Sequence, residues 1–167
     1  MQITAEMVKQ LRERTGAGIM DAKKALDASA GDMSKAEKSL AEKGMASALK
    51  KAGRVTSEGV IESYIHAGSR IGAMVDLNCE TDFVARTPEF KDLARNLAMQ
   101  IAAMSPRFVD RPHVPADVMN VKEEELLLKQ AYIRDSSKTI DDLIKETIAK
   151  VGENIQVRRF SRFSLGE

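Results

Sequence analysis

The chain has 167 residues, enough for one domain with a hydrophobic core or for a small module joined to a core domain. Apolar residues make up 43% and charged residues 31%, and the net charge of only +1 excludes nucleic-acid binding through overall charge. The charge is uneven, because residues 1–54 hold 11 Lys and Arg against 7 Asp and Glu, whereas the remainder holds 15 against 18. This distribution predicts a basic module joined to a mildly acidic one.

Cysteine content and hydropathy limit the cellular compartments in which we expect this protein. The single cysteine, Cys79, excludes an intramolecular disulfide framework and is typical of a reducing compartment. No apolar run reaches membrane-spanning length, and the first residues indicate a capped helix instead of a signal or transit peptide. We therefore expect a cytosolic protein or one in an organelle of bacterial origin.

Three short helices are predicted in the first 51 residues. Thr4 can cap the first helix, and the Gly-rich turn 15–18 ends it. The second spans residues 19–28, and its inward positions are Ile19, Ala22, Ala25 and Leu26. Asp32 caps the third helix, which Gly44 is expected to interrupt. A module this small usually binds another molecule.

The second helix offers three side chains away from its apolar stripe. Lys23 and Lys24 suit an ordinary solvated face. Met20 follows the Gly-rich turn and is a candidate for an exposed, adaptable apolar contact.

Alternating residues predict a hairpin and a later third strand. One strand covers residues 59–67, Gly68-Ser69 turns the chain, and a second strand ends at Cys79. The expected buried face of the second strand is Ile71, Ala73, Val75, Leu77 and Cys79. A third strand runs from Ile155 and should pair beside the hairpin, with alternation through Ile155, Val157, Arg159, Ser161, Phe163 and Leu165.

Helices separate the hairpin from the last strand. Thr87-Pro88 begins one, Ser105-Pro106 ends it, and an acidic helix is expected over residues 123–133. Thr139 and Asp142 have the spacing of a capping box and begin a helix that Gly152 ends. The fold class is therefore α+β, with a three-helix module and a core built on a three-stranded antiparallel sheet.

The stretch Thr81-Asp82-Phe83 interrupts the strand pattern. It is too polar to continue the buried face, and it holds no Gly or Pro for a simple hairpin. Phe83 can fold back over the core, as most Phe side chains do, or it can stay exposed as a contact for another molecule. Its local sequence alone favours the core position.

Catalytic residues are few. Cys79 and His66 could oppose each other on paired strands, but a cysteine within an apolar alternation is usually inert packing. There is no phosphate-binding loop motif and no metal-ligand spacing, so we expect no enzyme activity, metal or cofactor. RNA binding could be suggested by Arg158, Arg159 and Arg162 with Phe160 and Phe163, although a solvated strand edge fits the acidic surroundings and the alternation better. Protein binding remains the favoured function.

Three motifs resemble the signatures of a known family. Residues 11–26, which include Thr15-Gly16-Ala17-Gly18, are similar to the first signature of bacterial translation elongation factor Ts. Residues 80–85 resemble its second signature, and residues 152–159 resemble its closing strand. The resemblance runs in order over nearly the whole chain.

The resemblance implies a guanine-nucleotide exchange factor for elongation factor Tu that binds its partner in GDP-bound and nucleotide-free forms. It implies a module of ubiquitin-associated type at residues 1–54 and an α+β core, which also dimerises, at residues 55–167. The corner formed by Thr81, Asp82, Phe83 and Val84 would enter the partner, where Phe83 separates two helices and Asp82 disturbs the Mg²⁺ and phosphate site. The residues implied at the module's contact are Leu11, Arg12, Met20 and Lys23.

One departure from the family pattern concerns assembly. Longer members carry a further segment, which is abbreviated here to a short acidic helix within residues 116–130. Compact members are expected to form homodimers, giving a complex of two factors with two partner molecules. Cys79 could cross-link such a dimer if it lay near the axis. The resemblance implies no direct nucleic-acid or membrane partner, and it implies the bacterial cytoplasm or, for a plastid-encoded copy, the chloroplast stroma.

Overall fold

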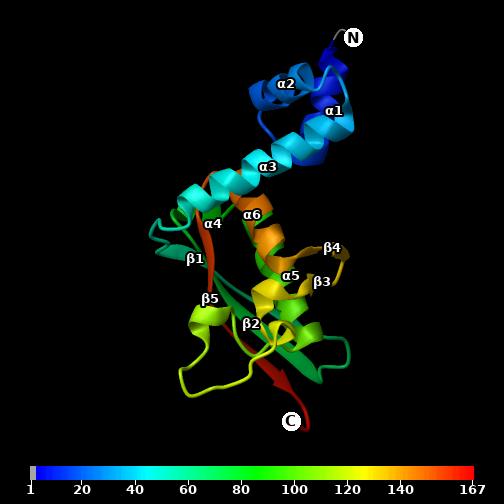
Figure 1. Cartoon of the computed structure of the whole chain (residues 1–167). Helices are drawn as coiled ribbons and strands as arrows, with labels where there is room; N and C mark the ends of the chain where they lie inside the picture. The colour runs from blue at the N-terminus through cyan, green and yellow to red at the C-terminus, as the bar shows by residue number, and fades with distance from the viewer. Residues whose placement is uncertain (1–2) are drawn as a thin grey trace.

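The computed structural model describes residues 3–167, with the elements arranged as in Figure 1. The α-helices are α1 (Ala5–Thr15), α2 (Ile19–Ala28), α3 (Met33–Lys51), α4 (Asp82–Ala85), α5 (Pro88–Met104) and α6 (Ile140–Val151). The strands are β1 (Glu58–Ile65), β2 (Ile71–Cys79), β3 (Ala131–Tyr132), β4 (Asp135–Thr139) and β5 (Ile155–Ser164). Three short 3-10 helices are η1 (Arg111–His113), η2 (Glu123–Glu125) and η3 (Leu127–Lys129).

The central sheet is antiparallel and has the order β1-β2-β5, which confirms the predicted α+β core with three strands. Four of the five residues expected on the buried face of β2 are in the core, and the fifth, Ile71, is partly buried and packs against it. Helix α5 packs against this face, and Thr87 caps it by accepting a hydrogen bond from the Phe90 amide at 3.4 Å. Its apolar stripe is fully in the core, as predicted, and comprises Phe90, Leu93, Ala94, Leu97, Ala98 and Ile101.

A β-bulge overturns the strict alternation predicted for β5. Val157 pairs with Leu77, but the next β2 residue, Asp76, pairs with Arg159, so Arg158 is the extra residue. The bulge reverses which side of the strand faces the core. Phe160 consequently packs against the core, and Phe163 points to the opposite face of the sheet.

The first three helices enclose a small core of their own. Its fully buried members are Leu11, Ala22, Ala25, Leu26 and Ala36. Thr4 and Asp32 cap α1 and α3 as predicted, and Gly16 ends α1 with a positive φ of 69°. The inward position predicted for Ile19 is wrong, because this first residue of α2 lies at the edge of the cluster and is 58% exposed.

Helix α3 runs without interruption through Gly44, contrary to the expected break. A Cβ added to Gly44 would lie 3.0 Å from the Cβ of Ala149 on α6. Glycine therefore allows the two helices to approach closely, and this packing offsets its low helix propensity of about 1 kcal/mol. Figure 1 shows α3 extending from the first two helices to the body of the molecule, where Ala48 joins the large core.

The acidic helix predicted over residues 123–133 is wrong. This stretch holds η2, η3 and the strand β3, which pairs with the unpredicted β4. The Leu127 amide donates to the Phe108 carbonyl at 2.9 Å, and the Leu128 amide donates to the Val109 carbonyl at 3.0 Å. The backbone donors of this segment are therefore used by a neighbouring loop and are not available for a helix.

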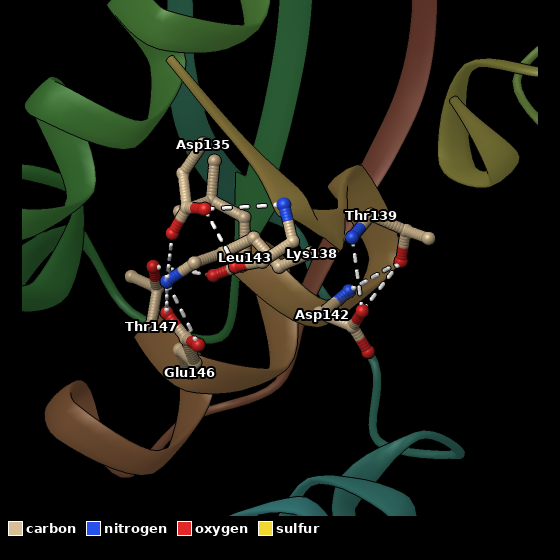
Figure 2. A network of polar contacts seen from close by, with 8 residues as sticks. Asp135, Lys138, Thr139, Asp142, Leu143, Glu146 and Thr147 are labelled. Atoms are coloured by element: carbon tan, nitrogen blue, oxygen red, sulfur yellow. Dashed lines mark hydrogen bonds and ion pairs between the residues drawn. The ribbon is translucent and has the colours of Figure 1, made fainter. Parts of the chain in front are cut away.

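Figure 2 shows the junction between β4 and α6. The predicted capping box is confirmed, because the Asp142 amide donates to Thr139 Oγ1 at 3.2 Å and the Asp142 carboxylate accepts from the Thr139 amide at 2.9 Å. Lys138 donates to Glu146 at 3.0 Å and lies 3.6 Å from Asp135. Burial alone would lower the pKa of Lys138, but these carboxylates outweigh it and raise the pKa, so the ion pairs hold the β3–β4 hairpin against α6.

Candidate functional site

The corner, defined here as residues 81–85, is a single turn of helix directly after β2. Thr81 caps it by accepting a hydrogen bond from the Val84 amide at 3.4 Å. Phe83 is 77% exposed, so the core position favoured by its local sequence is wrong. Val84 and Ala85 are buried in the large core. The corner thus combines two buried residues with an aromatic ring that faces solvent.

Asp82 lies beside this ring and also faces solvent. Its carboxylate accepts a hydrogen bond from Arg86 at 2.7 Å, one helical turn later. Both side chains are mostly exposed, and such pairs contribute only about 0.3–0.5 kcal/mol. The pair is therefore easily exchanged for another ligand of the Asp82 carboxylate.

Two contacts attach the ends of the corner to the rest of the fold. Thr87 Oγ1 donates to the Val84 carbonyl at 2.7 Å, which joins the corner to the start of α5. At the other end, the Glu153 carboxylate accepts from the Thr81 amide at 3.0 Å and from Thr81 Oγ1 at 2.7 Å. A single turn of helix is not stable alone, so these contacts determine where Phe83 points.

Cys79 is packing and not a reactive group. Its Sγ donates to the Thr81 carbonyl at 3.1 Å, and burial, reinforced by the Glu153 charge, raises its pKa to about 11. The alternative of a pair with His66 is excluded, because Cys79 pairs with Glu58 and His66 follows the opposite end of β1. Cys79 lies on the side of the central sheet that α5 covers. It therefore cannot cross-link two copies that meet through the other side of the sheet.

The other candidate residues lie on the first two helices. Met20 is 63% exposed and Lys23 is exposed on the next turn of α2, while Arg12 donates from Nε to the Ala17 carbonyl at 3.3 Å. Leu11 is fully buried in the small core, so its side chain presents no surface to a partner. Ile19, which pattern reasoning placed inward, adds an exposed apolar side chain next to Met20.

The two candidate groups lie on separate parts of the fold. The corner packs with the large core, whereas α2 belongs to the small one, and α3, about 28 Å long, connects them. The residues of each group are close together in sequence, but the two groups pack with different hydrophobic cores. This spacing suits a large, protein-sized ligand better than a small molecule.

The open face of the central sheet carries a second apolar surface. Its exposed large side chains, here called the outer face, are Ile61, Ile65, Met74 and Phe163. Gly72 lies between Ile65 and Phe163 in the register, and a Cβ there would lie 2.7 Å from Ile65 Cδ1. Ile65 therefore lies over this glycine, in space that a larger residue at position 72 would occupy.

Residues 3–167 contain no group of three or more His, Cys, Asp or Glu side chains placed to hold a metal ion. None of the helices in that range combines the length and the apolar character needed to cross a membrane.

Known proteins are similar to this chain over nearly all of its length. A model of the elongation factor Ts family matches residues 2–134. Elongation factor Ts of Carboxydothermus hydrogenoformans is 49% identical over 195 aligned residues, which cover 99% of this chain and 90% of that protein. The Syntrophomonas wolfei protein of the same name is 50% identical, covering 99% and 91%, and that of Methylacidiphilum infernorum is 48% identical, covering 99% and 96%. The first two alignments extend over more positions than the 167 residues of this chain, so those relatives carry residues that it lacks. The chain belongs to the elongation factor Ts family.

Proposed function

We propose that this chain is a guanine-nucleotide exchange factor for translation elongation factor Tu, acting through binding and not as an enzyme. Membership of the elongation factor Ts family supports this partner. The observation that carries the mechanism is the exposed Phe83 ring on a corner whose next two residues are buried. An aromatic ring held in water on a rigid support is available to bury its surface in a partner, as interface hot spots do.

Exchange needs differential binding and no bond chemistry. The chain binds the nucleotide-free partner more tightly than the GDP-bound partner, and linkage then requires GDP to bind more weakly in the complex. Phe83 enters between two helices of the partner's nucleotide-binding domain. GTP, being in excess, rebinds and displaces the factor.

Asp82 acts beside the ring. Its carboxylate is exposed and held only by the solvent-facing Arg86 pair, so it is free to approach the partner's Mg²⁺ shell. A carboxylate placed near that shell perturbs a charge-dense site through little contact area. Thr81 and Val84 contribute by holding the corner, Thr81 as its cap and Val84 through burial.

The N-terminal region, residues 1–54, is proposed to be a module of ubiquitin-associated type that binds a further helix of the same domain. The exposed apolar contacts are Met20 and its neighbour Ile19, with Lys23 and Arg12 supplying charge at the edge. Leu11 contributes indirectly, because it is buried where α1 meets the small core.

Residues 55–167 are proposed to form the core and the dimerisation domain. The outer face exposes four large apolar side chains in the single chain, beside the Asp76–Arg159 ion pair, and a second copy is its proposed occupant. A two-fold axis would bury the same face of both copies, giving two factors with two partner molecules. Because the relatives compared above are bacterial, we infer a bacterial cytoplasmic setting, with the chloroplast stroma as the alternative.

The proposed exchange activity predicts a direct kinetic result. GDP carrying a fluorescent label is bound to elongation factor Tu, and its release into excess unlabelled GDP is followed with and without this chain. We expect at least about a hundredfold acceleration of GDP release, which saturates with factor concentration. Weakening GDP binding by about 3 kcal/mol is within the range of coupling energies between sites. Release at the unassisted rate at all factor concentrations would exclude the proposed function.

A further inference from the structure

Two residues between α6 and β5 hold the corner without belonging to it. After Gly152 ends α6 with a positive φ of 80°, Glu153 and Asn154 lead into the first residue of β5. Because Ile155 pairs with Cys79, the turn formed by Glu153 and Asn154 lies opposite Glu80 and Thr81. The chain is therefore folded so that this turn faces the base of the corner.

The contacts between the turn and the corner are reciprocal. Glu153 accepts two hydrogen bonds from Thr81, one on each carboxylate oxygen, at 2.7 and 3.0 Å. In the opposite direction, the backbone amide of Asn154 donates to Glu80 Oε1 at 2.7 Å. Hydrogen bonds to a carboxylate are stronger and more directional than those between neutral groups. Together they fix the position of Glu80 and of Thr81, the residue that caps α4.

Asn154 extends the same network to the end of α3. Its side chain is 2% exposed, and its Nδ2 donates to the carbonyls of Arg54 at 2.9 Å and of Ala52 at 3.3 Å. Arg54 closes the network, with Nη1 lying 3.5 Å from Glu80 Oε1. One buried asparagine thus joins the segment after α3 to the residue before the corner.

We propose that Glu153 and Asn154 are positioning residues for nucleotide exchange, fixing the corner relative to the end of α3. This inference rests on the proposed function. The partner must meet the corner and the N-terminal helices together, and these lie at opposite ends of α3. A rigid link between them removes an ordering cost from the complex. A loosened corner still binds, but its ring and carboxylate no longer reach the nucleotide site in the geometry that expels GDP.

Saturation kinetics separates positioning from simple loss of folded protein. Partly unfolded factor raises the total concentration needed for half-saturation, but it leaves the rate at saturation unchanged. Loss of positioning lowers the rate at saturation itself. For Glu153→Ala, we expect the maximal rate of GDP release to fall about tenfold, with the half-saturating concentration within about threefold of that of the unmodified chain.

Further variants test the same bonds. Glu153→Gln keeps one acceptor and should give an intermediate maximal rate. Thr81→Val removes the hydroxyl donor at the other end, and combining it with Glu153→Ala should cost less than the sum of the two separate losses in log rate. Asn154→Asp replaces the side-chain donor with a carboxylate, which would face the carbonyls of Ala52 and Arg54. It should also lower the maximal rate of GDP release. Glu123→Ala, at an exposed glutamate outside this network, is the matched control and should match the unmodified chain.

The outcomes distinguish this inference from the proposed function. If the unmodified chain accelerates release and both Glu153→Ala and Thr81→Val keep its maximal rate within about twofold, the positioning role is wrong and the exchange function stands. Strictly additive losses would also contradict action through the Thr81–Glu153 contact. If the unmodified chain accelerates nothing, both the function and the inference are overturned.

Discussion

Phe83→Ala should abolish most of the acceleration of GDP release while leaving the fold intact. The residue is 77% exposed, so removal of its ring takes little packed surface from the fold. Truncating an aromatic hot spot at an interface typically costs about 2–4 kcal/mol, which corresponds to a fall of roughly 30- to 1000-fold in the rate relative to free factor and partner. Fluorescent GDP release measures the rate, and thermal unfolding measures stability.

Phe90→Ala is the matched control for this change. The side chain removed is the same, but Phe90 is fully buried in the large core. Its truncation should lower the free energy of unfolding by about 3–5 kcal/mol. A loss of stability for Phe83→Ala comparable to that for Phe90→Ala, with GDP release unaffected, would contradict the role given to the corner.

Met74→Asp should convert a dimer into a monomer. Met74 is on the central strand of the sheet, is 50% exposed, and points to the outer face between Ser63 and Ser161 in the register. In the proposed dimer each copy would place an unpaired carboxylate in an apolar interface, at a cost of several kcal/mol per carboxylate. Sedimentation over a range of concentrations should show the variant at the monomer mass of 18.4 kDa.

Met119→Asp controls for the added charge. Met119 is 77% exposed and lies in the loop between η1 and η2, and it is not one of the four outer-face residues. This variant should sediment like the unmodified chain. If the unmodified chain itself sediments at 18.4 kDa at every concentration, the outer face does not pair two copies.

Local signals predicted the helix starts and the presence of three strands well. Thr87, Thr139 and Asp32 are caps whose side chains accept backbone hydrogen bonds, and such motifs need only neighbouring residues. That β5 joins the hairpin also followed from alternation, since a lone third strand requires a partner, whereas its place beside β2 was not predicted. These features depend on short-range chemistry that a single sequence displays.

Long-range contacts explain the errors. Gly44 is typical of a helix break in the local sequence, but in the fold it lies against Ala149 of α6 and the helix continues. Residues 123–133 have a helical composition, but the loop at Phe108 and Val109 pairs with their backbone. The bulge at Arg158 reverses the last half of β5 and leaves no local mark. Each error arises where a residue distant in the chain decides the conformation.

The candidate site was predictable from motifs and not from local propensity. The pattern around Phe83 favoured burial, and only the resemblance indicated exposure, which the fold bears out. Ile19 was missed because its spacing matches the apolar stripe of α2, although the cluster ends before it. Glu153 and Asn154 were recognised as part of a motif, but their contacts to Thr81 and Glu80 depend on the pairing of β5 with β2.

Differential binding is the central claim, and titration calorimetry tests it directly. The affinity of this chain is measured for elongation factor Tu in two forms, one freed of nucleotide and one saturated with GDP and Mg²⁺. We expect at least about a hundredfold tighter binding to the nucleotide-free form, because linkage makes this ratio equal to the factor by which the chain weakens GDP. Equal affinity for the two forms would contradict exchange by this chain, however tightly it bound.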